Sequence, residues 1–164
     1  MEFAYKQPKH QDWFDVKVGN VRLNDVDIPG YFSTKELRVG GLWINDVLLQ
    51  NLKNRKIPVE PHIVPMIYEG LQKAPVRFKI DTASVANFSL VYEELPVKGD
   101  KPGKLYFTDM NGQFSGLTNI VSYPEQFIRL HADGNLMGSG HFTATWQLPV
   151  DSIIRPLSIG CPFG

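Results

Sequence analysis

Four histidines could act as metal ligands or as a general base: His10, His62, His131 and His141. A metal site needs further ligands at a fixed spacing, such as a second one four residues along a helix, and none of the four histidines has such a neighbour. On a strand, His131 and Asp133 would face the same side and could form a histidine–carboxylate pair. No serine or cysteine near them lies in the sequence context of a nucleophile elbow, so we expect these histidines at the surface or in turns.

Two further patterns could support acid–base catalysis or phosphate binding. Glu93 and Glu94 are adjacent carboxylates, but neighbouring residues of a strand face opposite sides, so the two would diverge at a solvated strand end. Gly134, Gly138 and Gly140 loosely resemble a phosphate-binding loop, but a strand follows them instead of a helix. A hairpin and close strand packing explain these glycines better. We therefore expect no enzyme, with no catalytic residue, no metal and no cofactor.

Charge and composition exclude several classes of partner. Lys plus Arg and Asp plus Glu both number 17, so no net charge draws the chain to nucleic acid. The small basic cluster Lys53–Lys56 has no interleaved aromatic residues and is read as a solvated loop. The single Cys161 cannot form an internal disulfide. No apolar stretch is long enough to span a membrane as a helix, and Met1–Asp12 lacks the apolar centre of a signal peptide.

An internal repeat organises the elements that would position any site. Val18–Ile28 and Val39–Leu49 share apolar residues at the same positions and the same Asn-Asp pair; Ile80–Leu90 keeps the apolar frame and one Asn, and residues 105–114 preserve part of it. Apolar residues alternate within each copy, which indicates strands. Short polar side chains tolerate unusual backbone angles, so the Asn-Asp pair predicts a bulge or bend in mid-strand.

The remaining sequence predicts three more strands, at 103–114, 127–136 and 141–148. Turn residues predict connections at Pro29-Gly30, 98–103 and 133–135. Apolar residues at helical spacing predict one short helix around residues 62–73. The fold expected is mainly β: a single domain made of a curved, repeat-built, largely antiparallel sheet with one short helix.

The order of several motifs resembles the AsmA-like family of large periplasmic envelope proteins, in particular the Bacteroidetes type. The resemblance covers most of the chain and is carried by five stretches: Leu48–Pro58, Phe78–Glu94, Pro102–Gly112, Leu117–Asn119 and Ala132–Phe142. It implies a long curved sheet with an apolar concave side, in a protein anchored in the inner membrane by an N-terminal helix. Related architectures include TamB and chorein-like proteins that move lipids between membranes.

The chain is expected to be a segment of such a longer protein. Its end, Ile153–Gly164, is apolar and rich in turn residues, without a polar tail or a helix cap. The resemblance implies a periplasmic location and neighbouring repeats of the same protein as partners. No transmembrane helix is present, which departs from the pattern of the full-length family.

Two functions remain open. In the first, an apolar groove binds or conducts phospholipid or another acyl-chain lipid, in support of outer-membrane biogenesis or homeostasis. In the second, the chain is a structural or interaction module that pairs through its sheet edges. Inward-facing apolar residues would line the groove or form a core: Val21, Leu23, Leu42, Ile44, Phe78, Ile80, Val85, Phe107, Phe142 and Trp146.

Overall fold

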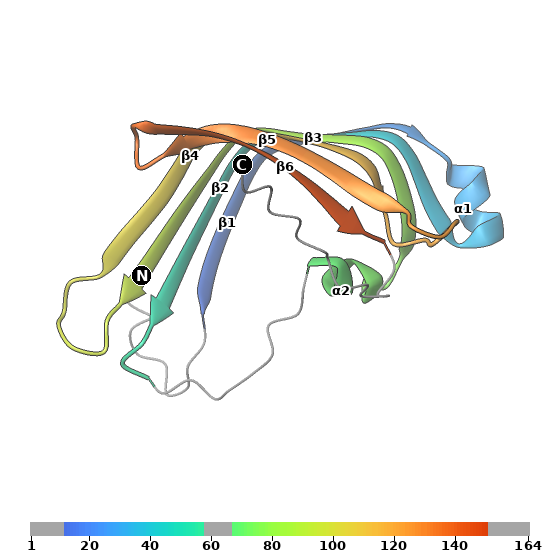
Figure 1. Cartoon of the computed structure of the whole chain (residues 1–164). Coiled ribbons are helices and arrows are strands. Elements are labelled where there is room, and N and C mark those ends of the chain that lie inside the picture. The colour runs from blue at the N-terminus through green and yellow to red at the C-terminus, as the bar shows by residue number, and fades with distance from the viewer. Residues whose placement is uncertain (1–11, 58–66, 151–164) are drawn as a thin grey trace, which may run out of the picture.

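A single six-stranded sheet dominates the computed structural model, which describes residues 12–57 and 67–150. The strands follow the chain order across the sheet: β1 (Trp13–Val26), β2 (Glu36–Asn54), β3 (Arg77–Leu95), β4 (Gly103–Thr118), β5 (Phe127–Leu136) and β6 (Gly140–Pro149). All neighbouring pairs are antiparallel except β2–β3, which is parallel. The sheet arches along its strands and stays open (Figure 1). The predicted mainly β, curved and largely antiparallel sheet is confirmed.

Two short helices accompany the sheet, where the sequence predicted one. Helix α2 (Ile67–Gln72) falls inside the predicted range of 62–73, of which residues 62–66 lie outside the described part of the chain. Helix α1 (Ile28–Thr34) replaces the turn predicted at Pro29-Gly30, and that prediction is wrong. The Asp27 carboxylate caps this helix by accepting a 2.8 Å hydrogen bond from the Gly30 amide, and Pro29 suits the first turn because it needs no amide partner.

The turn predicted at residues 133–135 is also wrong. Asp133, Gly134 and Asn135 lie within β5 and pair with β6. The chain reverses instead at residues 137–139, where Met137 (φ +53°) and Gly138 (φ +77°) adopt the left-handed conformation. Methionine is not a residue typical of such a turn, which explains why the sequence predicted the turn at the nearby Asp-Gly-Asn instead.

The repeat copies lie side by side in register. In the parallel pair β2–β3, Val39 is opposite Ile80 and Leu49 is opposite Leu90, so the second and third copies align residue for residue. The first copy, in β1, runs antiparallel to the second. Equivalent positions of the second and third copies therefore lie in one row across β2 and β3, whereas those of the first copy lie opposite other repeat positions.

Four residues at one repeat position adopt left-handed backbone angles in mid-strand: Asp25 (φ +52°), Asp46 (φ +58°), Asn87 (φ +53°) and Asp109 (φ +52°). Asn and Asp are the residues, after Gly, that tolerate this conformation best. The predicted bend at the polar repeat position is confirmed. It falls in all three clear copies and in the weak fourth one.

The partner strand accommodates each bend in the first two copies with a glycine. In the β1–β2 register, Asp25 faces Gly40 and Asp46 faces Gly19. A Cβ on Gly40 would lie 2.9 Å from the Asp25 Cβ, and one on Gly19 would lie 2.8 Å from the Asp46 Cβ, which is too close for any other residue. The glycine and aspartate of one repeat thus complement the aspartate and glycine of its antiparallel neighbour.

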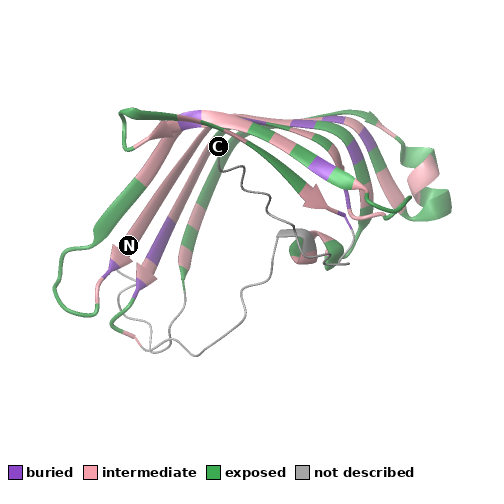
Figure 2. Ribbon diagram, in the orientation of Figure 1, coloured by how far each residue is buried: buried purple, intermediate pink, exposed green. Residues whose placement is uncertain are grey.

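Buried side chains are few and lie mainly toward the ends of the strands (Figure 2). The cluster Val39, Ile80 and Ala83 is packed by partly buried neighbours that include Phe114 and Leu117. It joins the start of β2 and β3 to the end of β4. The middle of the sheet has no second layer among the described residues, and its inner face is left as the candidate site.

Candidate functional site: a concave apolar groove

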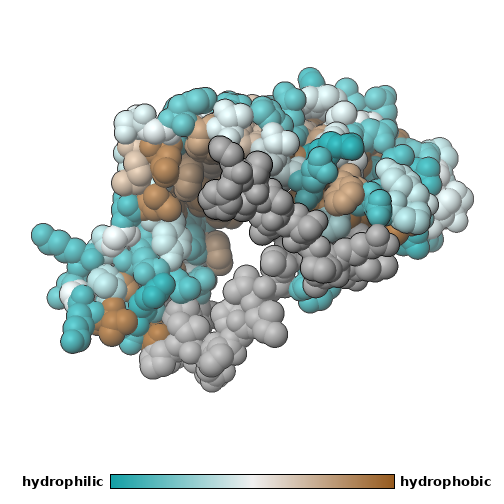
Figure 3. Space-filling model, viewed as in Figure 1, coloured by the Kyte–Doolittle hydropathy of each residue, from teal (hydrophilic) through white to brown (hydrophobic). Residues whose placement is uncertain are grey.

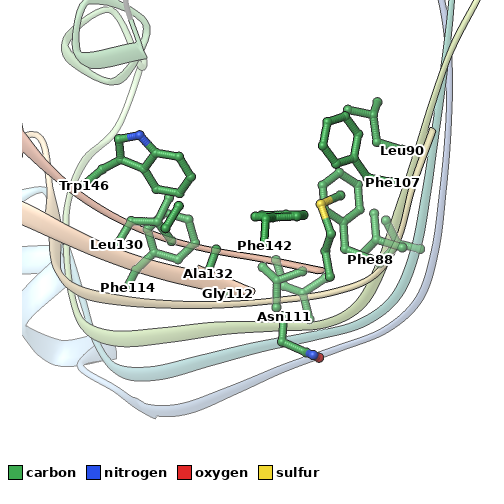
Figure 4. A pocket seen from close by; sticks show the side chains of 16 residues that line it. Phe88, Leu90, Phe107, Asn111, Gly112, Phe114, Leu130, Ala132, Phe142 and Trp146 are labelled. Atoms are coloured by element: carbon green, nitrogen blue, oxygen red, sulfur yellow. The ribbon is translucent and has the colours of Figure 1, made fainter. Parts of the chain in front are cut away.

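A groove of about 670 Å³ occupies the concave face of the arch and receives side chains from all six strands. Figure 3 shows hydrophobic side chains gathered beneath the arch and hydrophilic ones along its outer surface. Figure 4 shows the sheet bent into a U-shaped section, and the groove runs across the strands because residues of all six line it. Six strands spaced about 4.8 Å apart make a groove roughly 24 Å long.

The floor of the groove is kept low by small residues, and larger side chains form its walls (Figure 4). Gly112 and Ala132 line the floor, and Ala144, which pairs with Ala132, continues the groove lining on β6. Phe142 rises from it and contacts Phe107 edge to face, with ring centroids 5.7 Å apart and ring planes at 86°. The groove therefore exists because small residues line its floor and because the backbone of the sheet is bent.

Half of the residues predicted to face inward line this groove: Ile44, Val85, Phe107, Phe142 and Trp146. Ile80 belongs to the buried cluster, and Leu42 and Phe78 pack against it. Val21 and Leu23 lie on the edge strand β1, where they are 57% and 49% exposed. The predicted set thus divides into groove, core and exposed edge.

Several lining residues were not singled out from the sequence: Val47, Phe88, Leu90, Met110, Phe114 and Leu130. Val47, Phe88 and Met110 directly follow the left-handed residue of their strand. A left-handed residue shifts the alternation by one, so that Ile44 and Val47, three positions apart, both reach the groove. The polar repeat position indicated the bend, but strict alternation of inward and outward residues along the strand would place Val47, Phe88 and Met110 on the outer face.

Polar side chains follow the bends on the side of the sheet away from the groove. Asn87 Nδ2 donates a 2.7 Å hydrogen bond to Asp46 Oδ1, and Asn111 Nδ2 donates one of 3.3 Å to Asp133 Oδ2. Asn111 is the one polar side chain among the lining residues, and Figure 4 shows it turned away from the hollow. Apart from the Trp146 indole N–H, the described interior of the groove consequently offers an apolar surface.

The residues weighed for catalysis each contact a different partner. His131 Nδ1 lies 3.1 Å from Thr145 Oγ1, while Asp133 binds Asn111. Glu93 pairs with Lys104 and Glu94 with Arg55, at 3.6 Å and 2.8 Å. Within residues 12–57 and 67–150, no three histidine, cysteine or acidic side chains could hold a metal ion together. His10, His62 and Cys161 lie outside the described residues.

Two residues of the basic cluster after β2 are engaged in ion pairs. Arg55 binds Glu94, and Lys56 Nζ contacts Asp100 Oδ1 at 2.5 Å. The hydrogen bond and charge of Lys56 lower the pKa of Asp100. These contacts tie the end of β2 to β3 and to the following loop. The predicted loop begins only at Arg55, because Lys53 and Asn54 are the last residues of β2.

Tyr92 gives a pH-dependent prediction at this end of the sheet. Burial, and the hydrogen bond to Glu94 Oε2, raise the pKa of Tyr92 to about 12, while the same bond and Arg55 lower the pKa of Glu94. A tyrosine that ionises later in the folded than in the unfolded chain stabilises the fold below pH 10, and this contribution is lost as the pH rises from 10 to 12. We expect Tyr92 to titrate as a late phase in an ultraviolet pH titration. Tyr92→Phe should remove that late phase, and a late phase left intact in the variant would contradict the assignment.

None of the helices in the described residues is long and apolar enough to cross a membrane. Comparison of the chain with protein-family models, curated proteins and solved structures finds no match.

Proposed function

We propose that this chain is a non-enzymatic lipid-binding segment whose concave groove holds the acyl chain of a phospholipid or a similar lipid. The observation that carries the proposal is the apolar groove that crosses all six strands and that none of the residues in 12–57 and 67–150 covers. Each buried methylene contributes about 0.8 kcal/mol, so ~10 of them would supply roughly 8 kcal/mol before the entropic costs of binding. The lining is almost entirely apolar, with the Trp146 indole N–H as its one inward hydrogen-bond donor, which suits binding that allows sliding along the groove.

The setting proposed for this activity is the periplasm, in a longer AsmA-like protein that supports outer-membrane biogenesis or homeostasis. The motifs that resemble that family, together with the curved sheet, support this setting. Neighbouring repeats would continue the groove beyond this segment. Movement of a lipid along such a surface requires no catalytic residue, which agrees with the dispersed partners of His131, Asp133 and Glu93.

Ala144→Arg tests the groove because it places a charge in the apolar lining. We expect at least a tenfold weaker affinity for a polyene fatty acid whose fluorescence rises in apolar surroundings, because a buried unpaired charge is costly. Ala144→Phe should also weaken binding, by filling the space without a charge. Native mass spectrometry of gently extracted protein should detect bound phospholipid in the wild type.

Thr143→Arg is the matched control, since Thr143 is exposed, precedes Ala144 on β6 and pairs with Asp133. It should bind the fatty acid as the wild type does. Equal affinities of the wild type, A144R and A144F would show that the groove is not the binding site. A wild type that binds no fatty acid and carries no phospholipid would overturn the proposed function.

A further inference from the structure

A second groove, of about 520 Å³, lies on the outer face of the sheet and is lined by residues of β2 to β6. Thr145 lines it and stands between Ala144 and Trp146, which line the concave groove, so successive residues of β6 serve opposite faces. In the same way Trp43 lines the second groove and Ile44 the concave one. This outer groove has a size typical of small-molecule sites, which measure about 300–1,000 Å³.

Short polar side chains line the outer groove. Four of them carry hydroxyl groups and one an amide: Thr82, Ser84, Ser115, Thr145 and Gln113. Within the part of the chain that the structure describes, the side chains of Ser84, Ser115 and Gln113 have no hydrogen-bond partner. Hydroxyl and amide groups both donate and accept hydrogen bonds, so this lining suits a ligand rich in hydroxyl groups.

Trp43 forms the wall of the outer groove on β2. Its ring lies over Gly41, where a Cβ would be 2.1 Å from Trp43 Cη2, so the glycine leaves room for the ring. Arg22, its partner on β1, places a guanidinium 4.8 Å from the ring centre. Because no residue of β1 lines the outer groove, the ring meets the groove on its other side. An aromatic ring beside hydroxyl groups suits the apolar C–H face of a sugar ring.

Arg129 gives the outer groove its charge. It is the one permanently charged side chain among the lining residues, which include no Asp or Glu. Arg129 is exposed and has no ion-pair partner among residues 12–57 and 67–150. A guanidinium binds a carboxylate or a phosphate through paired hydrogen bonds. The groove therefore suits a ligand with a negative charge at β5.

We infer that the outer groove binds an acidic saccharide of at least two rings. One ring packs on Trp43, and the carboxylate or phosphate of the ligand binds Arg129. The strands β2 and β5 that carry these residues are three strand spacings apart, roughly 14 Å, which is longer than a single sugar ring. The inference does not rest on lipid binding, because the two grooves lie on opposite faces of the sheet.

The indole N–H signals of the three tryptophans show which face a ligand occupies in a two-dimensional NMR spectrum of the full chain. Trp43 lines the outer groove, Trp146 the concave groove, and Trp13 neither. Cellobiose 1-phosphate and the uronic acid of cellobiose should shift the Trp43 signal alone, which Trp43→Phe assigns. Neutral cellobiose should bind roughly tenfold more weakly, since it has no anion for Arg129. The tighter acid identifies the preferred anionic group.

Arg129→Gln tests the charge of the outer groove. It should weaken the binding of both acids roughly tenfold and leave that of cellobiose unchanged, so that the preference for an anion disappears. Lys17→Gln removes a positive charge from an exposed position of β1 outside the groove and should change none of the three affinities. An R129Q chain that still prefers the acids would contradict the role of Arg129.

Ser115→Tyr tests the hollow by filling it. The variant should keep the circular dichroism spectrum of the wild type and bind none of the three disaccharides. Thr143→Tyr, at an exposed position of β6 that lines neither groove, should bind them as the wild type does. No shift of Trp43 at millimolar disaccharide, a shift of Trp146 in its place, or equal binding by the wild type and S115Y would overturn the inference. Fatty-acid binding in the concave groove is read separately, at Trp146.

Discussion

Replacing Asp46 with valine should lower the free energy of unfolding by about 3 kcal/mol. Asp46 holds a left-handed backbone angle in the middle of β2. That conformation costs an L-residue about 1–2 kcal/mol and is particularly unfavourable for a β-branched one. The variant also loses the 2.7 Å hydrogen bond from Asn87, which contributes about 1 kcal/mol. Urea denaturation followed by circular dichroism measures the change.

Three companion variants separate the backbone effect from the side-chain effect. Asp46→Asn should be close to the wild type, because it keeps an acceptor and tolerates the left-handed angle. Asp46→Gly should lose only the hydrogen bond and remain more stable than Asp46→Val. Asp15→Val, at a partly exposed position of β1 without a left-handed angle, controls for adding a β-branched residue to a strand. If D46V and D15V are equally stable, the bend is not imposed by this residue.

The bends are the part of the fold that the sequence predicts best. Position 8 of each repeat carries Asp or Asn, and these side chains are the cheapest way, after Gly, to put a left-handed angle into a strand. The signal is local, since each bend depends on the residue at that position. Alternation, which is equally local, located β5 and β6 to within one residue at each end.

Long-range features were beyond the same reasoning. The parallel pairing of β2 with β3 depends on the connection that includes α2. Apolar and polar residues alternate in the same way in parallel and antiparallel strands, so the sequence pattern does not indicate which orientation a pair adopts. Whether Ile80 is core and Ile44 is groove depends on which parts of the concave face are covered, which is a tertiary property. Alternation alone cannot distinguish a side chain packed by neighbours from one that faces a hollow.

The turn errors had a different cause, because both sites carried competing signals. Pro29-Gly30 suits a turn, but it follows Asp27, and an Asp before a Pro is equally a helix start. Asp133-Gly-Asn135 suits a hairpin, but a Cβ on Gly134 would lie 2.6 Å from Met110 Cγ, so that glycine serves close packing between strands. In the first case the residues typical of a turn start a helix, and in the second the glycine allows close packing between strands.

The end of β4 is fixed by hydrogen bonds from two consecutive side chains of the Leu117–Asn119 motif. Asn119 Oδ1 accepts from the Phe78 amide at 2.8 Å, and Asn119 Nδ2 donates to the Val76 carbonyl at 2.8 Å and the Leu71 carbonyl at 3.3 Å. Thr118 Oγ1 donates to the Phe78 carbonyl at 2.6 Å and accepts from the Ile120 amide at 3.0 Å. This motif therefore ties β4 to the start of β3, beside the buried cluster.

Thr118→Val should destabilise the fold by about 2 kcal/mol although valine has the same shape. Thr118 is only 2% exposed, so the Ile120 amide would lose its hydroxyl partner where water has little access. The Phe78 carbonyl would keep one hydrogen bond, from the Asn119 amide, which limits the loss. Thr118→Ser retains the hydroxyl and removes a methyl group, so it should cost about 1 kcal/mol or less. Urea denaturation ranks the three chains, and a T118V chain at least as stable as T118S would show that the buried hydroxyl does not hold this end of the sheet.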